Sequence, residues 1–322
     1  MNLIRGNAPV LRKGRIQMYD IIIIGAGPAG LTAALYGCRA DKKVLIIEKE
    51  NFGGQITFSP KVENYPTQKE ISGSELAELM LDQVMAHGAD IELSEVIGIL
   101  DEEDHKLVVT TNGEFKAYSV IIAVGSKHRQ LGLPRENELT GQGVSYCAVC
   151  DGAFFNGKDV AVVGGGNTAL QEAVMLSEYC THVTVIQNLS TMTGEGRLVA
   201  ALEKRDNVTM IFDTVVTELI GEGELSAVAL KNTATGETST LAVDGLFVAI
   251  GQVPENECFS NVTALNEYGY IVADEQCLTD TKGIFVAGDC RTKQVRQITT
   301  ATGDGAVAAL AACRYVDNIK LA

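Results

Sequence analysis

The feature that most constrains this chain is a glycine-rich turn that occurs twice, each time directly after an apolar run and directly before a helical pattern. The first turn is Gly25-Ala-Gly27-Pro-Ala-Gly30, and the second is Gly164-Gly-Gly166-Asn-Thr-Ala169. In such a turn the first glycine permits a tight bend, the second lets the backbone approach a pyrophosphate, and the third position lets helix and strand pack closely. Free N–H groups at the start of the helix favour the phosphates. Each turn therefore predicts a dinucleotide site.

The sequence around the two turns is also duplicated. Each turn belongs to the same order of strand, helix, strand, β-rich excursion and a late strand that ends in glycine. The first copy is expected at 19–24, 28–39, 44–48, 91–115 and 120–124, and the second at 159–163, 167–179, 182–187, 208–243 and 246–250. An internal duplication of a dinucleotide-binding fold is the simplest account.

The C-terminal stretch has too few elements for a third domain. A strand at 283–287 and an Ala-rich helix at about 299–317 should instead return to complete the first domain. The predicted fold class is α/β, with two Rossmann-like dinucleotide-binding domains, each a three-layer ββα arrangement, the second inserted into the first. The predicted boundaries are 19–126 together with 255–322 for the first domain, and 127–254 for the second.

Composition narrows the class of protein. The formal net charge of −15 leaves no electrostatic footprint for nucleic acid or an anionic membrane, and no apolar run approaches the roughly 20 residues of a bilayer span. The basic segment 1–18 lacks the apolar core of a secretory signal, so we interpret it as a disordered leader or a tag. Eight cysteines, widely spaced except for one pair, fit a reducing cytoplasm.

The exceptional pair is Cys147-Ala-Val-Cys150, followed by Asp151. Two thiols separated by two residues can close a small disulfide ring, and one thiolate is stabilised relative to a free cysteine. Asp151 could carry a proton as the disulfide opens. The alternative, half of a zinc site, needs a second Cys or His pair at ligand spacing, and the sequence has none. We therefore predict a redox-active pair and no metal.

Two further acidic residues point to a flavin in the first domain. Glu48 ends the second strand, 18 residues beyond Gly30, where a carboxylate can accept hydrogen bonds from an adenosine ribose; the alternative is a surface carboxylate. Gly283-Ile-Phe-Val-Ala-Gly288-Asp289 resembles the second flavin fingerprint of flavoproteins with two dinucleotide-binding domains. In those proteins the Asp holds the ribityl chain, which implies FAD rather than NAD in this domain.

From about residue 19 to the C-terminus the chain resembles the low-molecular-weight thioredoxin reductases. The matching motifs, in family order and spacing, are Gly25 to Gly30, Phe52-Gly-Gly-Gln55, Val62-Glu-Asn64-Tyr-Pro66, Cys147 to Gly152, Gly164 to Ala169, Gly288-Asp289 and Arg296-Gln297. The resemblance implies that Cys150 is the thiol nearest the flavin, that Cys147 attacks thioredoxin, and that Asp151 is the acid or base. It also implies a homodimer.

The resemblance and the two turns together give the expected binding residues. In the FAD site we expect Gly25, Gly27, Pro28, Ala29, Gly30, Glu48, Lys49, Gly54, Gln55, Asn64, Gly125, Gly288, Asp289, Arg296 and Gln297. In the pyridine-nucleotide site we expect Gly164, Gly166, Asn167, Thr168, Ala169 and Gln187.

The chain departs from the family where the coenzyme is chosen. NADPH-dependent members carry His-Arg-Arg-x-x-x-Arg, whereas Asn188, Leu189 and Thr193 stand at the three arginine positions here, and no cation occurs before Arg197. NADH is therefore favoured over NADPH, as in NADH-linked relatives such as the flavoprotein subunit of alkyl hydroperoxide reductase.

The predicted function is thioredoxin-disulfide reduction, with electrons passing from a pyridine nucleotide through FAD to Cys147 and Cys150. Two alternatives keep the same chemistry with a peroxiredoxin-type partner or with a non-pyridine donor such as ferredoxin. A third, of another class, is an FAD-binding redox sensor without turnover.

Overall fold

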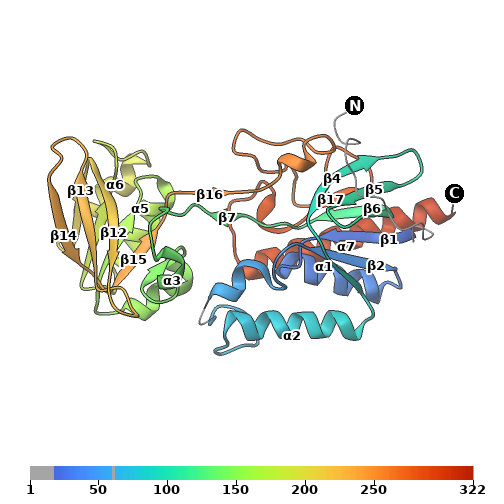
Figure 1. The fold of residues 1–322 in the computed structure, drawn as a ribbon, viewed down its shortest axis with the longest axis horizontal. Helices are drawn as coiled ribbons and strands as arrows, with labels where there is room; N and C mark the ends of the chain where they lie inside the picture. The colour runs from blue at the N-terminus through green and yellow to red at the C-terminus, as the bar shows by residue number, and fades with distance from the viewer. Residues whose placement is uncertain (1–17, 60–61, 322) are drawn as a thin grey trace. The chain divides into compact units, whose positions relative to one another are not determined.

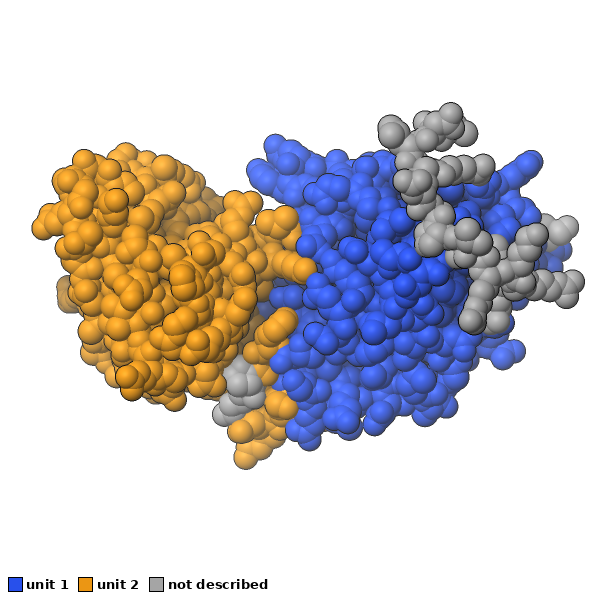
Figure 2. Space-filling view, viewed as in Figure 1, with its two compact units in different colours: residues 1–57, 73–126, 254–322 blue, residues 58–72, 127–253 orange. Residues whose placement is uncertain are grey.

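A computed structural model describes residues 18–59 and 62–321 of the chain. The predicted leader lies outside these residues, except that Met18 already begins the first strand. The chain divides into two compact units, residues 1–57, 73–126 and 254–322, and residues 58–72 and 127–253 (Figure 2). Segment 58–72, which we expected in the first domain, is grouped with the second unit.

The first unit is built on a seven-stranded sheet of order β3-β2-β1-β6-β5-β4, with β17 also paired to β6 (Figure 1). Its strands are β1 (Met18–Ile24), β2 (Val44–Glu48), β3 (Asp90–Leu93), β4 (Val96–Asp101), β5 (Lys106–Thr110), β6 (Glu114–Ile122) and β17 (Ile284–Val286). The long strand β6 pairs antiparallel with β5 and parallel with β1 and β17. The late strand expected at 120–124 is thus the end of a longer one, and the C-terminal strand completes this sheet as predicted.

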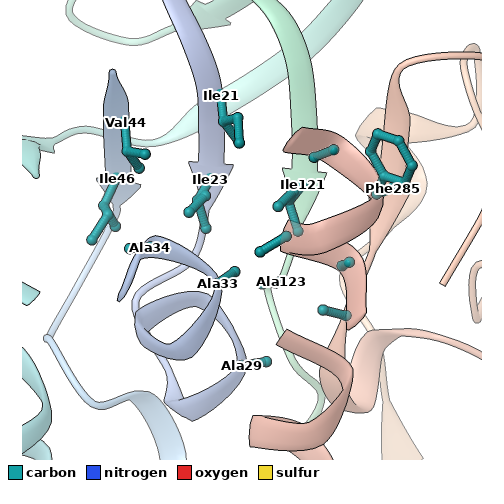
Figure 3. Close-up of a cluster of buried hydrophobic side chains, with 14 of the residues drawn as sticks. Ile21, Ile23, Ala29, Ala33, Ala34, Val44, Ile46, Ile121, Ala123 and Phe285 are labelled. Carbon is teal, nitrogen blue, oxygen red and sulfur yellow. The ribbon is translucent and has the colours of Figure 1, made fainter. Parts of the chain in front are cut away.

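Both faces of the parallel part of the sheet are covered, which explains its continuous apolar strands. Ile21, Ile23 and Ile46 belong to a core cluster with the helices α1 (Pro28–Arg39) and α7 (Ile298–Leu321) (Figure 3). The alternate residues of the same strands, such as Ile22, belong to a second cluster on the opposite face, with Val108 and Phe259. Helix α2 (Gly73–Ala86), which the sequence patterns did not indicate, packs against α1.

The second unit repeats the plan with a five-stranded parallel sheet of order β11-β10-β9-β15-β8 and a separate antiparallel sheet of order β12-β13-β14. The parallel strands are β8 (Val144–Ser145), β9 (Asp159–Val163), β10 (His182–Ile186), β11 (Val208–Ile211) and β15 (Gly245–Val248). The antiparallel strands are β12 (Thr214–Ile220), β13 (Ala227–Asn232) and β14 (Thr238–Ala242). The helices are α3 (Glu136–Leu139), α4 (Ala148–Asp151), α5 (Asn167–Leu176) and α6 (Gly196–Leu202).

The connecting segments and the layers agree with a duplicated ββα plan. Strands β7 (Lys127–His128) and β16 (Gln252–Val253), which carry the chain into and out of the second unit, pair antiparallel. In each unit, helices pack on one face of the parallel sheet and antiparallel strands pack on the other. The predicted α/β class with two Rossmann-like folds is therefore confirmed. Within residues 18–59 and 62–321, no helix is long and apolar enough to cross a bilayer.

Candidate active site: a redox disulfide and two nucleotide turns

The two glycine-rich turns have the same local geometry at their first glycine. Gly25 has a φ of +103° and Gly164 a φ of +132°, in the region that side chains rarely adopt. A Cβ on Gly25 would lie 2.4 Å from the carbonyl oxygen of Ala123, and one on Gly164 would lie 2.5 Å from that of Ala249. Each turn therefore passes so closely over the residue that follows a parallel strand, β6 in the first unit and β15 in the second, that only glycine fits.

The second position of each turn leaves open space above the backbone, and the third position lets the helix pack closely on the strand. A Cβ on Gly27 would meet nothing nearer than 4.0 Å, and one on Gly166 nothing nearer than 3.9 Å. A Cβ on Gly30 would lie 1.9 Å from the oxygen of Gly25, so this site excludes any side chain, whereas the second unit accommodates Ala169 there. The space above Gly27 and Gly166, at the start of α1 and α5, suits a pyrophosphate.

The carboxylate of Glu48 ties the end of β2 to the first turn. Its Oε2 accepts a hydrogen bond from Ala26 N (2.7 Å), and its Oε1 accepts from Lys49 N (2.8 Å) and Glu50 N (2.9 Å). The side chain of Lys49 forms an ion pair with Glu255. Glu48 thus lies at the predicted FAD turn, where it fixes the backbone, and its contact with a ribose stays a prediction.

Two further glycines, Gly53 and Gly54, lie next to the first turn. Gly54 begins the short helix η1 (Gly54–Phe58), and Gly53 directly precedes it. Gly53 N donates to Ala26 O (2.8 Å), and the Cα of Gly27 is 3.4 Å from where a Cβ on Gly54 would lie. Gly54 is thereby brought to the first turn, and Gly53 is a contributor that we did not single out. Gln55 is exposed, and Asn64 is exposed in the segment grouped with the second unit, so their binding roles stay predictions.

Asp289 lies in the short helix η4 (Gly288–Cys290), directly after β17. A Cβ on Gly288, whose φ is +80°, would lie 2.9 Å from the Cβ of Ala29, so η4 packs against the first turn of α1. The Oδ1 of Asp289 is buried and has no hydrogen-bond partner among the described residues, although Lys293 Nζ forms an ion pair with it at 3.9 Å. Burial raises the pKa of this carboxyl, against the charges of Lys293 and Arg296. A buried acceptor that lacks a donor beside the first turn fits the hydroxyl-rich ribityl chain of FAD.

The position of η4 depends on Asp304 of α7, a residue that sequence reasoning missed. Its carboxylate accepts hydrogen bonds from Gly288 N (3.0 Å), from Arg291 Nε and Nη2 (2.9 Å each) and from Lys293 Nζ (2.9 Å). Arg291 is only 2% exposed. The available signal for this network was a carboxylate between two glycines, Gly303 and Gly305, in the Ala-rich first half of α7. Asp304 therefore holds the loop that presents Asp289.

The remaining expected flavin residues lie around Asp289. The guanidinium of Arg296 lies 4.3 Å from the ring centre of Tyr270, and its Nε donates to the Asp289 carbonyl (3.4 Å). Burial raises the pKa of the Cys290 thiol to about 12, and the backbone of Gly125 lies close enough to oppose that rise. Gln297 N donates to Thr300 Oγ1 (3.1 Å). Arg296, Tyr270 and Lys293 also line a cavity of about 460 Å³. The structure thus brings Gly125 and Arg296 to the region of Asp289.

In the second unit, hydrogen bonds join the loop after β10, residues 187–195, to the glycine-rich turn at 164–169. Gln187 is 3% exposed, and its amide donates to Thr191 O (3.0 Å) and accepts from Asn188 N (3.2 Å). Gly165 O accepts from the backbone N–H groups of both residues 193 and 194 (2.9 Å each). The side chain of Gln187 therefore stabilises the loop, and its predicted contact with a ribose stays untested.

The end of this loop carries a negative charge beside the turn. Asn167 donates through Nδ2 to Glu195 Oε1 (3.2 Å) and accepts from Glu195 N through Oδ1 (2.7 Å). Arg197, the first cation after β10, forms an ion pair with Glu195. Thr168 is exposed at the start of α5, while Ala169 is buried. The loop from 187 to 195 therefore offers no cation for a 2′-phosphate.

Cys147 and Cys150 form a disulfide at the start of α4. Cys147 is the N-cap residue, and its Sγ accepts a hydrogen bond from Cys150 N (3.2 Å). Both residues are partly exposed. Asp151 Oδ2 accepts from Ser145 Oγ (2.7 Å), and that hydroxyl in turn accepts from Cys147 N (3.1 Å). The predicted pair and its acid are therefore one hydrogen-bonded group.

A second carboxyl, which sequence reasoning also missed, lies beside this group. Glu172 projects from α5, and its Oε1 accepts from Ala148 N (3.4 Å). Burial, opposed by that N–H and reinforced by the charge of Asp151, raises the pKa of Glu172 to about 7. Burial also raises the pKa of Asp151, against the hydrogen bond from Ser145. Nothing in the local sequence distinguishes Glu172 from an exposed helical glutamate.

Comparison with known proteins agrees with this geometry. Residues 19–305 match the family described as pyridine nucleotide-disulphide oxidoreductase. The chain is 43% identical to a thioredoxin reductase of Listeria innocua over 94% of this chain and 96% of the relative, and 42% identical to that of Bacillus subtilis with the same coverage. The crystal structure of thioredoxin reductase from Streptococcus pyogenes, 40% identical, superposes with a TM-score of 0.90 over 94% of this chain and 99% of that chain.

The matched region includes the glycine turns, the disulfide and the strand before Asp289, so the likeness covers all the site residues that the structure brings together. The chain therefore belongs to the pyridine nucleotide-disulphide oxidoreductases, within the low-molecular-weight thioredoxin reductase family, and is an FAD-dependent disulfide oxidoreductase.

Proposed function

We propose that the chain is a thioredoxin-disulfide reductase that uses a pyridine nucleotide, NADH in preference to NADPH, to reduce thioredoxin or a thioredoxin-like protein through FAD and the Cys147–Cys150 disulfide. The observation that carries the proposal is a partly exposed disulfide beside an acid: Cys147 N donates to Ser145 Oγ, which in turn donates to Asp151 Oδ2. The same chain also has two glycine-rich turns of the kind that bind dinucleotides. The names of its relatives support thioredoxin as the partner. From the sequence, we place the enzyme in the cytoplasm as a homodimer.

FAD would be held in the first unit by the turn at Gly25 and Gly27, by Glu48, and by Asp289, whose buried Oδ1 lacks a donor among the described residues. When bound, it supplies the two electrons that open the disulfide. Asp304 keeps Asp289 in place through Gly288 N and Arg291.

The chain's own residues then carry out thiol–disulfide exchange. The Cys147 thiolate attacks one sulfur of the partner disulfide, which forms a mixed disulfide and releases the other partner sulfur as a thiolate. Cys150 next attacks Cys147 Sγ, which restores the Cys147–Cys150 bond and releases the second partner thiol. The Cys150 N–H that donates to Cys147 Sγ stabilises negative charge on that sulfur. Asp151 exchanges the proton at this pair.

The loop after β10 predicts the choice of coenzyme. The 2′-phosphate of NADPH would find no cation between residues 187 and 195, and Arg197, the first cation beyond them, is paired with Glu195. A hydrogen bond to a charged group is worth about 1.5–3 kcal/mol. We therefore expect kcat/KM for NADH to exceed that for NADPH by about tenfold or more. The measurement is an anaerobic titration of the flavin absorbance with each nucleotide, followed by turnover with thioredoxin.

A matched pair of variants tests the physical reason. Asn188 and Leu189 are exposed, so the double variant N188R/L189R should bind the 2′-phosphate and shift the preference toward NADPH. Thr238→Arg, at an exposed position on β14, adds a cation elsewhere in the same unit and should leave the preference unchanged. A wild-type preference for NADPH would contradict the donor assignment, and absence of thioredoxin-dependent turnover with every donor would contradict the proposed function.

A further inference from the structure

Two partly buried carboxyl groups lie beside the redox disulfide in the second unit, and the proposed exchange uses only one of them. Asp151 ends α4, the short helix that carries the disulfide, and Glu172 lies on α5, which packs against α4. Ala148 N, one residue after Cys147, donates to Glu172 Oε1 (3.4 Å). Glu172 is therefore attached to the same turn of backbone as the disulfide.

Each carboxyl has one oxygen bonded and one oxygen without a donor. Asp151 Oδ2 accepts from Ser145 Oγ, and Glu172 Oε1 accepts from Ala148 N. The other two oxygens, Asp151 Oδ1 and Glu172 Oε2, are buried and have no hydrogen-bond partner among the residues that the structure describes. A carboxylate oxygen that is buried without a donor is costly when charged, and protonation is the usual way in which such a group lowers that cost.

The surrounding groups favour one proton on the pair. The groups that act on the two carboxyls are Ser145 of β8, the Ala148 N–H of α4 and the carboxyls themselves, and none of these is a cation. Tyr179 follows α5, and its hydroxyl packs against Gly152. The pKa of Tyr179 is raised, chiefly by its own burial and to a lesser extent by nearby charges that include Glu172. Because the charge of Asp151 raises the pKa of Glu172, the two carboxyls do not readily carry two negative charges at once, and their titrations are coupled.

We propose that Glu172 is a positioning residue for the disulfide chemistry: its carboxylate shares one proton with Asp151, so that Asp151 is protonated when the disulfide opens. In the balanced step the S–S bond accepts two electrons, supplied by the established oxidoreductase activity, and breaks into two sulfurs. One sulfur takes the proton from Asp151 and becomes a thiol, and the other remains a thiolate. The carboxyl pair is left doubly charged and regains its proton from solvent. The inference rests on the proposed function only in taking Asp151 as the proton donor.

The test is the pH dependence of the midpoint potential of the Cys147–Cys150 pair in the holoenzyme. The pair is equilibrated anaerobically with dithiothreitol buffers, alkylated, and quantified by mass spectrometry of the peptide that contains both cysteines. Because reduction leaves a negative sulfur beside the pair, proton uptake is linked to reduction. The plot of potential against pH should therefore change slope in the wild type where the coupled pair, whose Glu172 has its pKa raised to about 7, loses its proton. This readout needs neither thioredoxin nor a nucleotide.

Glu172→Gln keeps the acceptor for Ala148 N but removes the charge that holds the proton. The pKa of Asp151 should then fall, and the change of slope should move down by about one pH unit or more. Glu178→Gln, which removes an exposed charge just after the same helix, should leave the profile as in the wild type. Glu172→Asp, which retains a carboxylate, should restore part of the wild-type profile and guards against a purely structural effect of the amide.

The inference is overturned if the profile of Glu172→Gln matches those of the wild type and Glu178→Gln, or if the Asp and Gln variants shift equally. Thioredoxin turnover, assayed in parallel on the wild type, separates this result from the proposed function. A shifted profile without any thioredoxin turnover would support the shared proton and contradict thioredoxin as the acceptor.

Discussion

Replacing Cys150 by serine is expected to abolish thioredoxin turnover and to trap the partner protein as a mixed disulfide on Cys147. The attacking thiol remains, but no second thiol is left to resolve the intermediate, so turnover should fall by on the order of a thousandfold or more. The disulfide links residues only three apart in sequence, so its loss should cost about 2 kcal/mol or less in the free energy of unfolding. The protein should therefore remain folded and bind FAD.

The measurement is the recovery of the covalent complex after incubation with thioredoxin and its release by dithiothreitol. The reciprocal variant, Cys147→Ser, should be equally inactive but should accumulate no complex, because Cys150 is not the sulfur that meets the partner. Cys258→Ser, at a partly buried lone cysteine of the first unit, is the control and should keep full turnover. Accumulation on Cys147→Ser instead of Cys150→Ser would reverse the two assigned roles.

The sequence predicted the framework well because the constraints on it are local. Strand, turn and helix around Gly25 were expected at 19–24 and 28–39 and occur at Met18–Ile24 and Pro28–Arg39, since a glycine at positive φ and a proline at the first helical position define the boundary. The C-terminal helix was expected at about 299–317 and extends over Ile298–Leu321, because no glycine or proline marks its end. Helix α2 was missed because it belongs to neither duplicated motif.

The site could be predicted only where a motif is contiguous. Gly25, Gly164 and the Cys147–Cys150 pair act through their own neighbours, so their spacing alone indicates their chemistry. Asp304 and Glu172 act through residues 16 and 24 positions away, and their importance depends on burial that periodicity does not reveal. The role of such a carboxylate can be inferred only when the structure shows which hydrogen-bond donors it has and which of its oxygens lack one.

Replacing Asp304 by alanine is expected to release FAD and to destabilise the first unit. Arg291 and Lys293, with side chains 2% and 6% exposed, would lose their shared acceptor, and Gly288 N would lose its partner. Removing one partner from a buried ion pair costs about 3–5 kcal/mol. The ion pairs that remain, from Arg291 to Glu275 at 3.8 Å and from Lys293 to Asp289 at 3.9 Å, are too long for hydrogen bonds and compensate only in part. The same change frees the loop that presents Asp289. The measurements are the free energy of unfolding by urea and the flavin content after dialysis.

Two further variants separate the loss of the Asp304 charge from the effect of changing any residue of α7. Asp304→Asn keeps an acceptor for Gly288 N and should destabilise the protein less than alanine does. Asp317→Asn, which breaks the ion pair with Lys42 at a 52% exposed carboxylate of the same helix, should change stability by less than about 1 kcal/mol. Flavin retention by Asp304→Ala at the wild-type level would contradict the assigned role of Asp304.

The pH dependence of the free energy of unfolding shows whether Asp304 stabilises the folded protein as a carboxylate or as a protonated acid. Burial alone would raise the pKa of Asp304, but the hydrogen bonds from Arg291 and Lys293 outweigh it, and the pKa lies below its ordinary value of 3.8. A depressed pKa means that the folded state holds the carboxylate more strongly than the unfolded chain does, so the stabilisation is fully present above pH 3.8 and is lost as the pH falls through the lower folded-state pKa. The stability difference between the wild type and Asp304→Asn should therefore be constant at neutral pH and shrink below pH 3.8. A difference that shrinks instead as the pH rises would show that Asp304 is held in its protonated form.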